Sequence, residues 1–143
     1  MFGSFHIFVR PAELAGRLPL GALFIAEAIS KLLDVPGALA YMAGYELPGP
    51  LLAPAVAVEL AGGLAIMLGW QTRVAALALS GFCVMTAFLF HSDLANRGQV
   101  IHFEKDLALA GAFLVLWARG PGQLSLDAWR NRNPSPKEVR AGP

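Results

Sequence analysis

The chain has little charge and almost no cysteine, and each shortage excludes a class of protein. Only 15% of its 143 residues are charged while 56% are hydrophobic, and the mean hydropathy is +0.56. A water-soluble domain of this length needs more charge, because exposed apolar surface aggregates. The single cysteine, Cys83, excludes an internal disulfide and a Cys-x-x-Cys redox pair. The sequence therefore predicts one integral membrane domain.

Several sequence patterns are also missing. The net charge is only +1 and there is no basic patch with interleaved aromatic residues, so no nucleic acid partner is expected. Apolar and polar residues do not alternate, so transmembrane strands are not expected either. A helix is then the remaining way to satisfy every backbone polar group in lipid. The predicted fold class is an all-α membrane protein, a four-transmembrane-helix bundle with both termini cytoplasmic.

Four apolar stretches define the predicted spans, at about residues 18–33, 51–68, 74–90 and 102–118. The last stretch is apolar without interruption only over 107–118, which makes about 18 Å of helix. A hydrocarbon core is ~30 Å thick, so this helix must either extend upstream through the charged residues that precede it or be buried and tilted. Those charged residues therefore lie at the membrane boundary.

Basic residues set the predicted orientation. With four spans both termini share one side, which would hold eight of the eleven Lys and Arg residues. The other side keeps three: Lys31, Arg97 and Lys105. The termini are therefore predicted to be cytoplasmic. In this arrangement 1–13 is an N-terminal interfacial segment and 14–119 the transmembrane domain. The remainder, 120–143, is a cytoplasmic tail with one short helix begun by Ser125.

Ionisable residues occur inside or at the edge of three spans, where each costs roughly 2.5–3.5 kcal/mol and is a functional candidate by default. Glu27 and Lys31 are four residues apart with the acid first, the better orientation for a helix pair. They form either a structural ion pair or a polar lining for a ligand or proton path. Glu59 has no opposite charge within its own helix turn, so its partner must be Lys31, Lys105 or a histidine.

The predicted topology places seven polar residues at a similar depth in the outer half of the bundle. Glu27 and Glu59 are each about seven or eight residues, or ~10 Å, from the outer ends of their spans, and we expect them to exchange protons. The expected ligand-binding residues at the same level are Lys31, His91, His102, Lys105 and Asp106. This layer either holds a ligand or only holds the helices together.

Two pairs of ring side chains near this layer have open interpretations. His91 and His102 could ligate haem or a metal, although histidines at span ends are commonly interfacial, and no residue is assigned as a metal ligand. Tyr41 and Tyr45 lie in the outer segment between the first two spans. They form either a lid over the polar layer or part of an ordinary interfacial loop.

Several segments, in this order and at this spacing, resemble the DoxX family of small bacterial four-helix membrane proteins over about residues 14–127. They are Arg17-Leu18 and Gly21 leading to Lys31-Leu32-Leu33, Glu59-Leu60-Ala61-Gly62-Gly63, Leu68-Gly69-Trp70-Gln71-Thr72-Arg73, His102-Phe103-Glu104-Lys105-Asp106-Leu107-Ala108-Leu109-Ala110-Gly111 and Gly120-Pro121-Gly122-Gln123-Leu124-Ser125-Leu126-Asp127. The resemblance implies redox work at a membrane, as in a subunit of a thiosulfate:quinone oxidoreductase. It carries over Lys31, Glu59, Lys105 and Asp106 as a polar site.

Three functions are compatible with these observations. The first is an inner-membrane subunit of a redox system that binds a quinone-type ligand in the outer half of the bundle. Because the chain has no nucleotide motif and no cysteine cluster, it would need a redox partner protein. The second is an assembly or anchoring subunit that contacts lipid and either a partner or a second copy of itself. The third is a small transporter component, against which the absence of discontinuous helices argues mildly.

Overall fold

The structure is a computed structural model that describes residues 5–133, with side chains described from Val9 onward. Residues 1–4 and 134–143, the ends of the predicted N-terminal segment and tail, lie outside the described residues. The elements in chain order are α1 (Phe5–Leu33), α2 (Val35–Ala43), the short 3-10 turn η1 (Gly49–Leu51), α3 (Leu52–Leu68), α4 (Thr72–Phe90), α5 (Arg97–Arg119) and α6 (Leu126–Arg132). The described chain has no strand, so the all-α fold class is confirmed.

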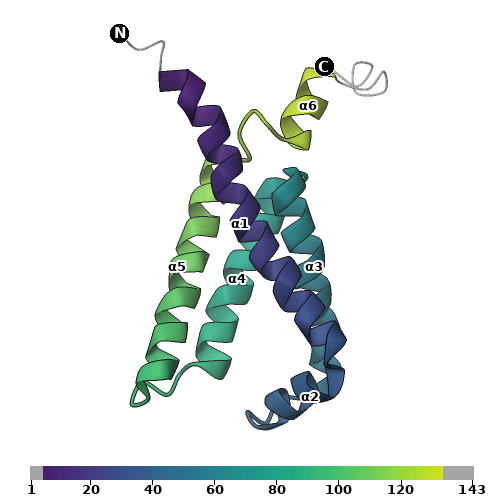
Figure 1. The fold of residues 1–143 in the computed structure, drawn as a ribbon, viewed down its shortest axis with the longest axis vertical. Helices are drawn as coiled ribbons and strands as arrows, with labels where there is room; N and C mark the ends of the chain where they lie inside the picture. The colour runs from purple at the N-terminus through teal and green to yellow at the C-terminus, as the bar shows by residue number, and fades with distance from the viewer. Residues whose placement is uncertain (1–4, 134–143) are drawn as a thin grey trace, which may run out of the picture.

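The four long helices pack as two pairs. α1 packs along α3, α4 packs along α5, and α3 contacts α4 to join the pairs. The start of α1 and α6 lie at one end of the bundle, and α2 and the α4–α5 connection lie at the other (Figure 1). We call these the α6 end and the α2 end. They correspond to the predicted cytoplasmic and outer ends.

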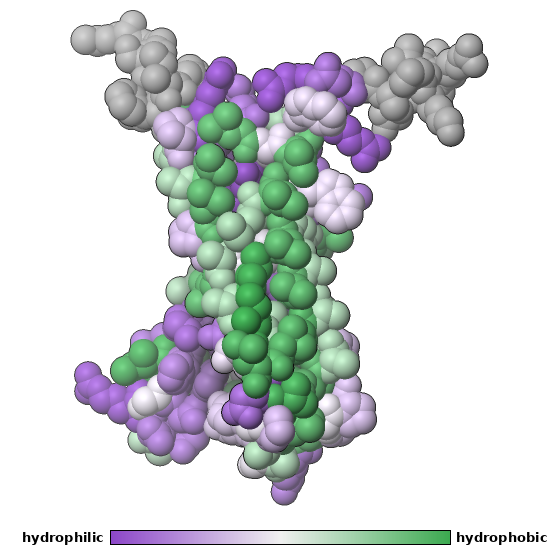
Figure 2. All heavy atoms as spheres, turned by 45° about the vertical axis from the view of Figure 1, so that its right-hand side comes forward, coloured by the Kyte–Doolittle hydropathy of each residue, from purple (hydrophilic) through white to green (hydrophobic). Residues whose placement is uncertain are grey.

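The surface between the two ends is apolar. Figure 2 shows hydrophobic residues along the middle of one face and hydrophilic residues at both ends. Large side chains are left uncovered, including Val74 (66% exposed) and Val115 (62%), as expected of a surface that lipid or another protein covers. By length and hydropathy, two helical segments of the described chain qualify as spans, Gly49–Leu68 and Thr72–Phe90. The other two predicted spans belong to α1 and α5, which carry more charge.

α1 and α3 touch through their backbones. A Cβ atom built on Gly21 would lie 2.5 Å from the carbonyl oxygen of Gly63, and one built on Gly63 would lie 2.8 Å from that of Gly21. No larger residue fits at either position without moving the helices apart. The hydrophobic core includes Phe24, Leu79 and Phe113, and the rings of Phe24 and Phe113 meet edge to face with centroids 5.4 Å apart.

The segment after α5 is fixed to the α6 end of the bundle. Ser125 caps α6, as the sequence predicted, by accepting a hydrogen bond from the Ala128 N–H. Asp127 accepts hydrogen bonds from the N–H groups of Gln71 and Thr72, at 2.8 and 2.9 Å, and so caps α4. The buried Arg17 guanidinium donates to the carbonyl oxygens of this segment, Pro121 O at 2.5 Å and Leu124 O at 2.7 Å.

Candidate functional site

The first group of polar residues joins α1 to α3, and we call it the ion-pair cluster (Glu27, Lys31 and Glu59). Lys31 Nζ lies 2.9 and 3.0 Å from the two carboxylate oxygens of Glu59, and 3.5 Å from Glu27 Oε2. The Glu59 side chain is 5% exposed, while that of Glu27 is 57% exposed. Of the three partners that the sequence left open for Glu59, the structure therefore provides Lys31. The two acids are unequal, because only Glu59 is enclosed.

The second group joins α4 to α5, and we call it the histidine cluster (Thr86, His91, Gln99, His102 and Asp106). His91 Nε2 lies 3.8 Å from Asp106 Oδ2, and the hydroxyl of Thr86 lies 3.4 Å from the same oxygen. The rings of His91 and His102 stack at 5.0 Å with an angle of 24° between them. His102 itself is exposed, whereas the His91 and Asp106 side chains are mostly buried.

The hydrogen bonds around His91 determine which of its ring nitrogens carries a proton. Gln99 Nε2 donates to the Tyr45 hydroxyl at 3.2 Å, so Gln99 presents Oε1 to His91 Nδ1 at 2.6 Å. An amide oxygen is only an acceptor, so Nδ1 carries hydrogen. Nε2 is the ring nitrogen that faces Asp106 Oδ2. At 3.8 Å, His91 Nε2 and Asp106 Oδ2 are too far apart for a direct hydrogen bond. Nε2 is therefore able to form a hydrogen bond with another group.

Three aromatic rings cover the α2 end. Tyr41 stacks on Phe90 with ring centroids 5.4 Å apart, and Tyr45 meets Phe90 edge to face at 5.1 Å. Partial burial and a hydrogen bond with Tyr45 raise the pKa of Tyr41 to about 12, so its hydroxyl stays protonated at neutral pH. Because Tyr41 lies on α2 and Phe90 ends α4, these rings connect α2 to the end of α4.

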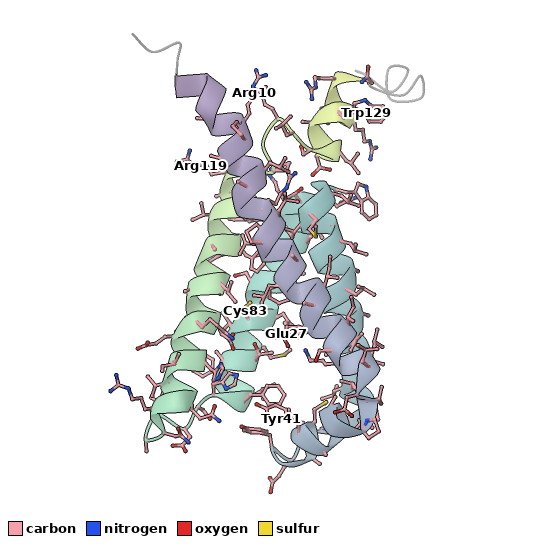
Figure 3. All side chains as sticks on the ribbon, in the orientation of Figure 1. Arg10, Glu27, Tyr41, Cys83, Arg119 and Trp129 are labelled. Carbon is pink, nitrogen blue, oxygen red and sulfur yellow. The ribbon has the colours of Figure 1, made fainter. Side chains whose placement is uncertain are left out.

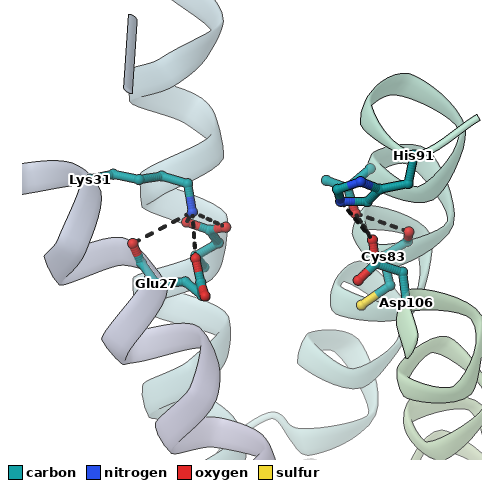
Figure 4. A network of polar contacts seen from close by, with 7 residues as sticks. Glu27, Lys31, Cys83, His91 and Asp106 are labelled. Atoms are coloured by element: carbon teal, nitrogen blue, oxygen red, sulfur yellow. Dashed lines mark hydrogen bonds and ion pairs between the residues drawn. The ribbon is translucent and has the colours of Figure 1, made fainter. Parts of the chain in front are cut away.

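The two clusters lie on opposite sides of the α2 half of the bundle. In Figure 4, Lys31 and Glu27 are on one side and His91 and Asp106 on the other, while Figure 3 places Glu27, Cys83 and Tyr41 toward the α2 end. Cys83 is buried in α4, and its carbonyl oxygen accepts a hydrogen bond from the hydroxyl of Thr86 at 3.0 Å. Cys83 therefore adjoins the histidine cluster through Thr86.

The structure divides the predicted layer of seven residues between these clusters. Glu27, Lys31 and Glu59 form one cluster, and His91, His102 and Asp106 belong to the other. Lys105 is exposed, and none of the ion pairs found among residues 9–133 includes it. Within the described chain no three His, Cys, Asp or Glu side chains are grouped as a metal ion would require.

Sequence reasoning missed two members of the histidine cluster. Gln99 falls before the predicted fourth span, yet it belongs to α5, which begins five residues earlier than that span. Asn96 carried the signal, because its side chain caps this helix by accepting from the Gly98 N–H. Thr86 lies inside an apolar run, where a lone hydroxyl gives no sign of its partner.

Comparison with known proteins gives a family and two relatives. The family model described as DoxX matches residues 12–92. The chain is 39% identical over 119 residues to the inner membrane protein YqjF of Escherichia coli, covering 83% of this chain and 92% of the relative. It is 34% identical over 121 residues to the inner membrane protein YphA of the same organism, covering 80% and 86%. No solved structure matches.

Proposed function

This chain belongs to the DoxX family and is a multi-pass protein of the bacterial inner membrane, and we propose that it is a membrane subunit of a redox system that binds a quinone-type ligand. The proposed site is the α2 half of the bundle, between the ion-pair cluster and the histidine cluster. The observation that carries the proposal is that each helix pair holds one side chain that can bind and release a proton, Lys31 in α1 and His91 directly after α4.

The side chains present fit a flat ring with a carbonyl oxygen on each side. Lys31 would exchange one of its contacts within the ion-pair cluster for a hydrogen bond to one oxygen. His91 Nε2 would donate to the other oxygen when the ring carries a second proton. The rings of Tyr41, Tyr45 and Phe90 would contact the apolar face. A quinone bound there would take up two electrons and two protons.

Each donor has a carboxylate that can restore its proton. Glu59 touches Lys31 at 2.9 Å, and Asp106 faces His91 at 3.8 Å. In this proposal Glu27, which is more than half exposed, passes protons between the surface and Lys31. The electrons come from a partner redox protein, because the chain offers one cysteine and no nucleotide motif.

Quinone binding by the purified protein in lipid nanodiscs tests this proposal. We expect Lys31→Met and His91→Gln each to weaken binding of a short-chain ubiquinone by roughly 10- to 100-fold, the range for a lost hydrogen bond to a charged group. Arg97→Gln, at the exposed start of α5, is the matched control and should bind as the wild type does. Unchanged binding in both cluster variants would exclude the site.

An anchoring function has its own support, because the Lys31–Glu59 contact joins α1 to α3 whatever else it does. In that case the same variants would lower the yield of a complex with a partner protein, or of a homo-oligomer. Any redox activity per assembled complex would stay normal. Measuring yield and quinone binding on the same preparations separates the two functions.

A further inference from the structure

Gln99 connects three segments of the α2 end through one side chain. It lies in the first turn of α5, where a glutamine can reach back to the N–H of the residue that caps the helix. Here the N–H of the cap residue, Asn96, donates to Asp93 O at 3.2 Å instead. The Gln99 amide is therefore left for other partners, which are His91 after α4 and Tyr45 after α2.

Tyr45 holds this amide in one orientation. It lies in the turn that follows α2, where its own N–H donates to Met42 O at 3.0 Å. Its hydroxyl accepts from Gln99 Nε2 at 3.2 Å, so Oε1 is the amide atom that meets His91 Nδ1, at 2.6 Å. Turning the amide over would place its N–H groups against the ring and reverse the polarity of that contact. The turn after α2 therefore determines which amide atom His91 meets.

The tautomer of His91 decides which kind of ligand oxygen its other nitrogen can bind. With hydrogen on Nδ1, a neutral imidazole has an unprotonated Nε2, which accepts a hydrogen bond and cannot donate one. Nε2 faces Asp106 Oδ2 at 3.8 Å (Figure 4), and an ionised carboxylate is also an acceptor only. The hydroxyl of Thr86 lies nearer to Cys83 O, at 3.0 Å, than to this carboxylate oxygen, at 3.4 Å. This side of the histidine cluster therefore offers mainly acceptors to a ligand.

We propose that Gln99 is a positioning residue that makes the histidine cluster select a ligand hydroxyl over a ligand carbonyl. The inference rests on the proposed function and names the form of the ligand. A quinol, whose hydroxyl donates to His91 Nε2, binds to the neutral ring better than the quinone does. The carbonyl oxygen of the quinone needs a second proton on the ring before Nε2 can donate to it. Because Tyr45 holds Gln99, a movement of the turn after α2 would release the amide and remove the selection.

Nitrogen NMR of the protein carrying isotopically labelled histidine tests the positioning without any ligand, and His91→Gln assigns the signal. At a pH where the ring is neutral, we expect His91 to carry its hydrogen on Nδ1, the less common tautomer of free histidine. Gln99→Leu should move the hydrogen mainly to Nε2, and Tyr45→Phe should give a mixture. Gln99→Glu should keep it on Nδ1, because a carboxylate also accepts. Hydrogen on Nε2 in the wild type, or an unchanged tautomer in Gln99→Leu, would overturn the proposal.

Binding of a short-chain ubiquinol and of the matching ubiquinone, measured without oxygen in nanodiscs, tests the selection. We expect the wild type to bind the quinol about fivefold more tightly, the equivalent of one neutral hydrogen bond. Gln99→Leu should abolish this difference. Gln123→Leu, which replaces an exposed glutamine at the α6 end, is the matched control and should keep it.

The outcomes separate this inference from the proposed function. Equal binding of quinol and quinone by the wild type would overturn the selection and leave the proposed function standing. Binding of neither form would overturn both. Circular dichroism establishes that the helices of each variant are intact. Tyr45→Phe keeps the ring that contacts Phe90, so it tests the same selection if Gln99→Leu does not fold.

Discussion

Glu59 is the buried charge on which the ion-pair cluster depends. Its side chain is 5% exposed, and Lys31 supplies two hydrogen bonds to it from the neighbouring helix. Removing one partner of a buried pair leaves the other charge uncompensated, which costs more than the pair itself contributes. The two acids beside Lys31 should therefore respond very differently to substitution.

We predict that Lys31→Met lowers the free energy of unfolding by about 3 kcal/mol, because it leaves the Glu59 carboxylate without its cation. Thermal unfolding in detergent, followed by circular dichroism, measures the change. The double variant Lys31→Met with Glu59→Gln should recover most of the loss. Failure of the double variant to recover would show that Lys31 stabilises through packing instead.

We predict that Glu27→Gln changes the same free energy by less than about 1 kcal/mol, because an exposed ion pair at 3.5 Å contributes little. The same unfolding assay measures it. A loss as large as that of Lys31→Met would mean that Glu27, and not Glu59, is the principal partner of Lys31.

At the scale of the elements, the α1–α3 pair depends on two glycines. Gly21→Ala and Gly63→Ala should each lower the free energy of unfolding by about 1–3 kcal/mol, the usual cost of overpacking. The added methyl would press on the opposing backbone. It should also lengthen the Lys31–Glu59 contact, so quinone binding would weaken together with stability.

Gly81 and Gly111 provide matched controls for this prediction. A Cβ atom at either position meets nothing within 4 Å, and both residues lie inside helices. Alanine there should stabilise the protein by up to about 1 kcal/mol, the difference in helix propensity. Equal destabilisation at all four glycines would contradict the close approach of α1 and α3.

Asp127, which lies in α6, caps the start of a different helix, α4. Asp127→Ala should lower the free energy of unfolding by about 1–2 kcal/mol, because two N–H groups at the start of α4 lose their acceptor. Limited proteolysis should show faster cleavage between α5 and α6. Asp34→Ala, which removes the cap of α2 instead, should leave that cleavage rate unchanged.

Helix existence was easier to predict from the sequence than helix ends. The four apolar stretches correspond to α1, α3, α4 and α5, but α1 begins at Phe5 rather than near Pro19. A proline in a first turn and a proline inside a helix look alike in sequence, and here the helix continues through Pro11 and Pro19. α2 was missed although Asp34 and Pro36 mark its start, because the segment is too short to show a period.

At the scale of the whole molecule, the sequence predicted how deep each charged residue lies along its helix. It did not predict how each helix is rotated about its own axis. The topology gave the position of each charge along its helix axis, and so brought the seven residues to one half of the bundle. It could not give which helices face each other. That depends on packing, such as the contact of Gly21 with Gly63. The separation into two clusters therefore appears only in the structure.

We predict that the membrane arrangement can be read by cysteine labelling in intact cells, after Cys83→Ala removes the natural thiol. Ala95→Cys, between α4 and α5, should react with a membrane-impermeant maleimide. Asn131→Cys, in α6, should react only after the membrane is permeabilised, because the α6 end is predicted to be cytoplasmic. Labelling of Asn131→Cys alone in intact cells would reverse the orientation.

Arg17 has a consequence for how the chain is made. The residue is 2% exposed, and its two acceptors, Pro121 O and Leu124 O, follow it by 104 and 107 residues. During synthesis the cation in α1 therefore lacks both of these acceptors until the chain has been made through residue 124, beyond the end of α5. The segment that follows α5 therefore completes the hydrogen bonding of a cation in α1. A chain interrupted before Pro121 would lack both acceptors, so the Arg17 guanidinium would have to be hydrated by water instead.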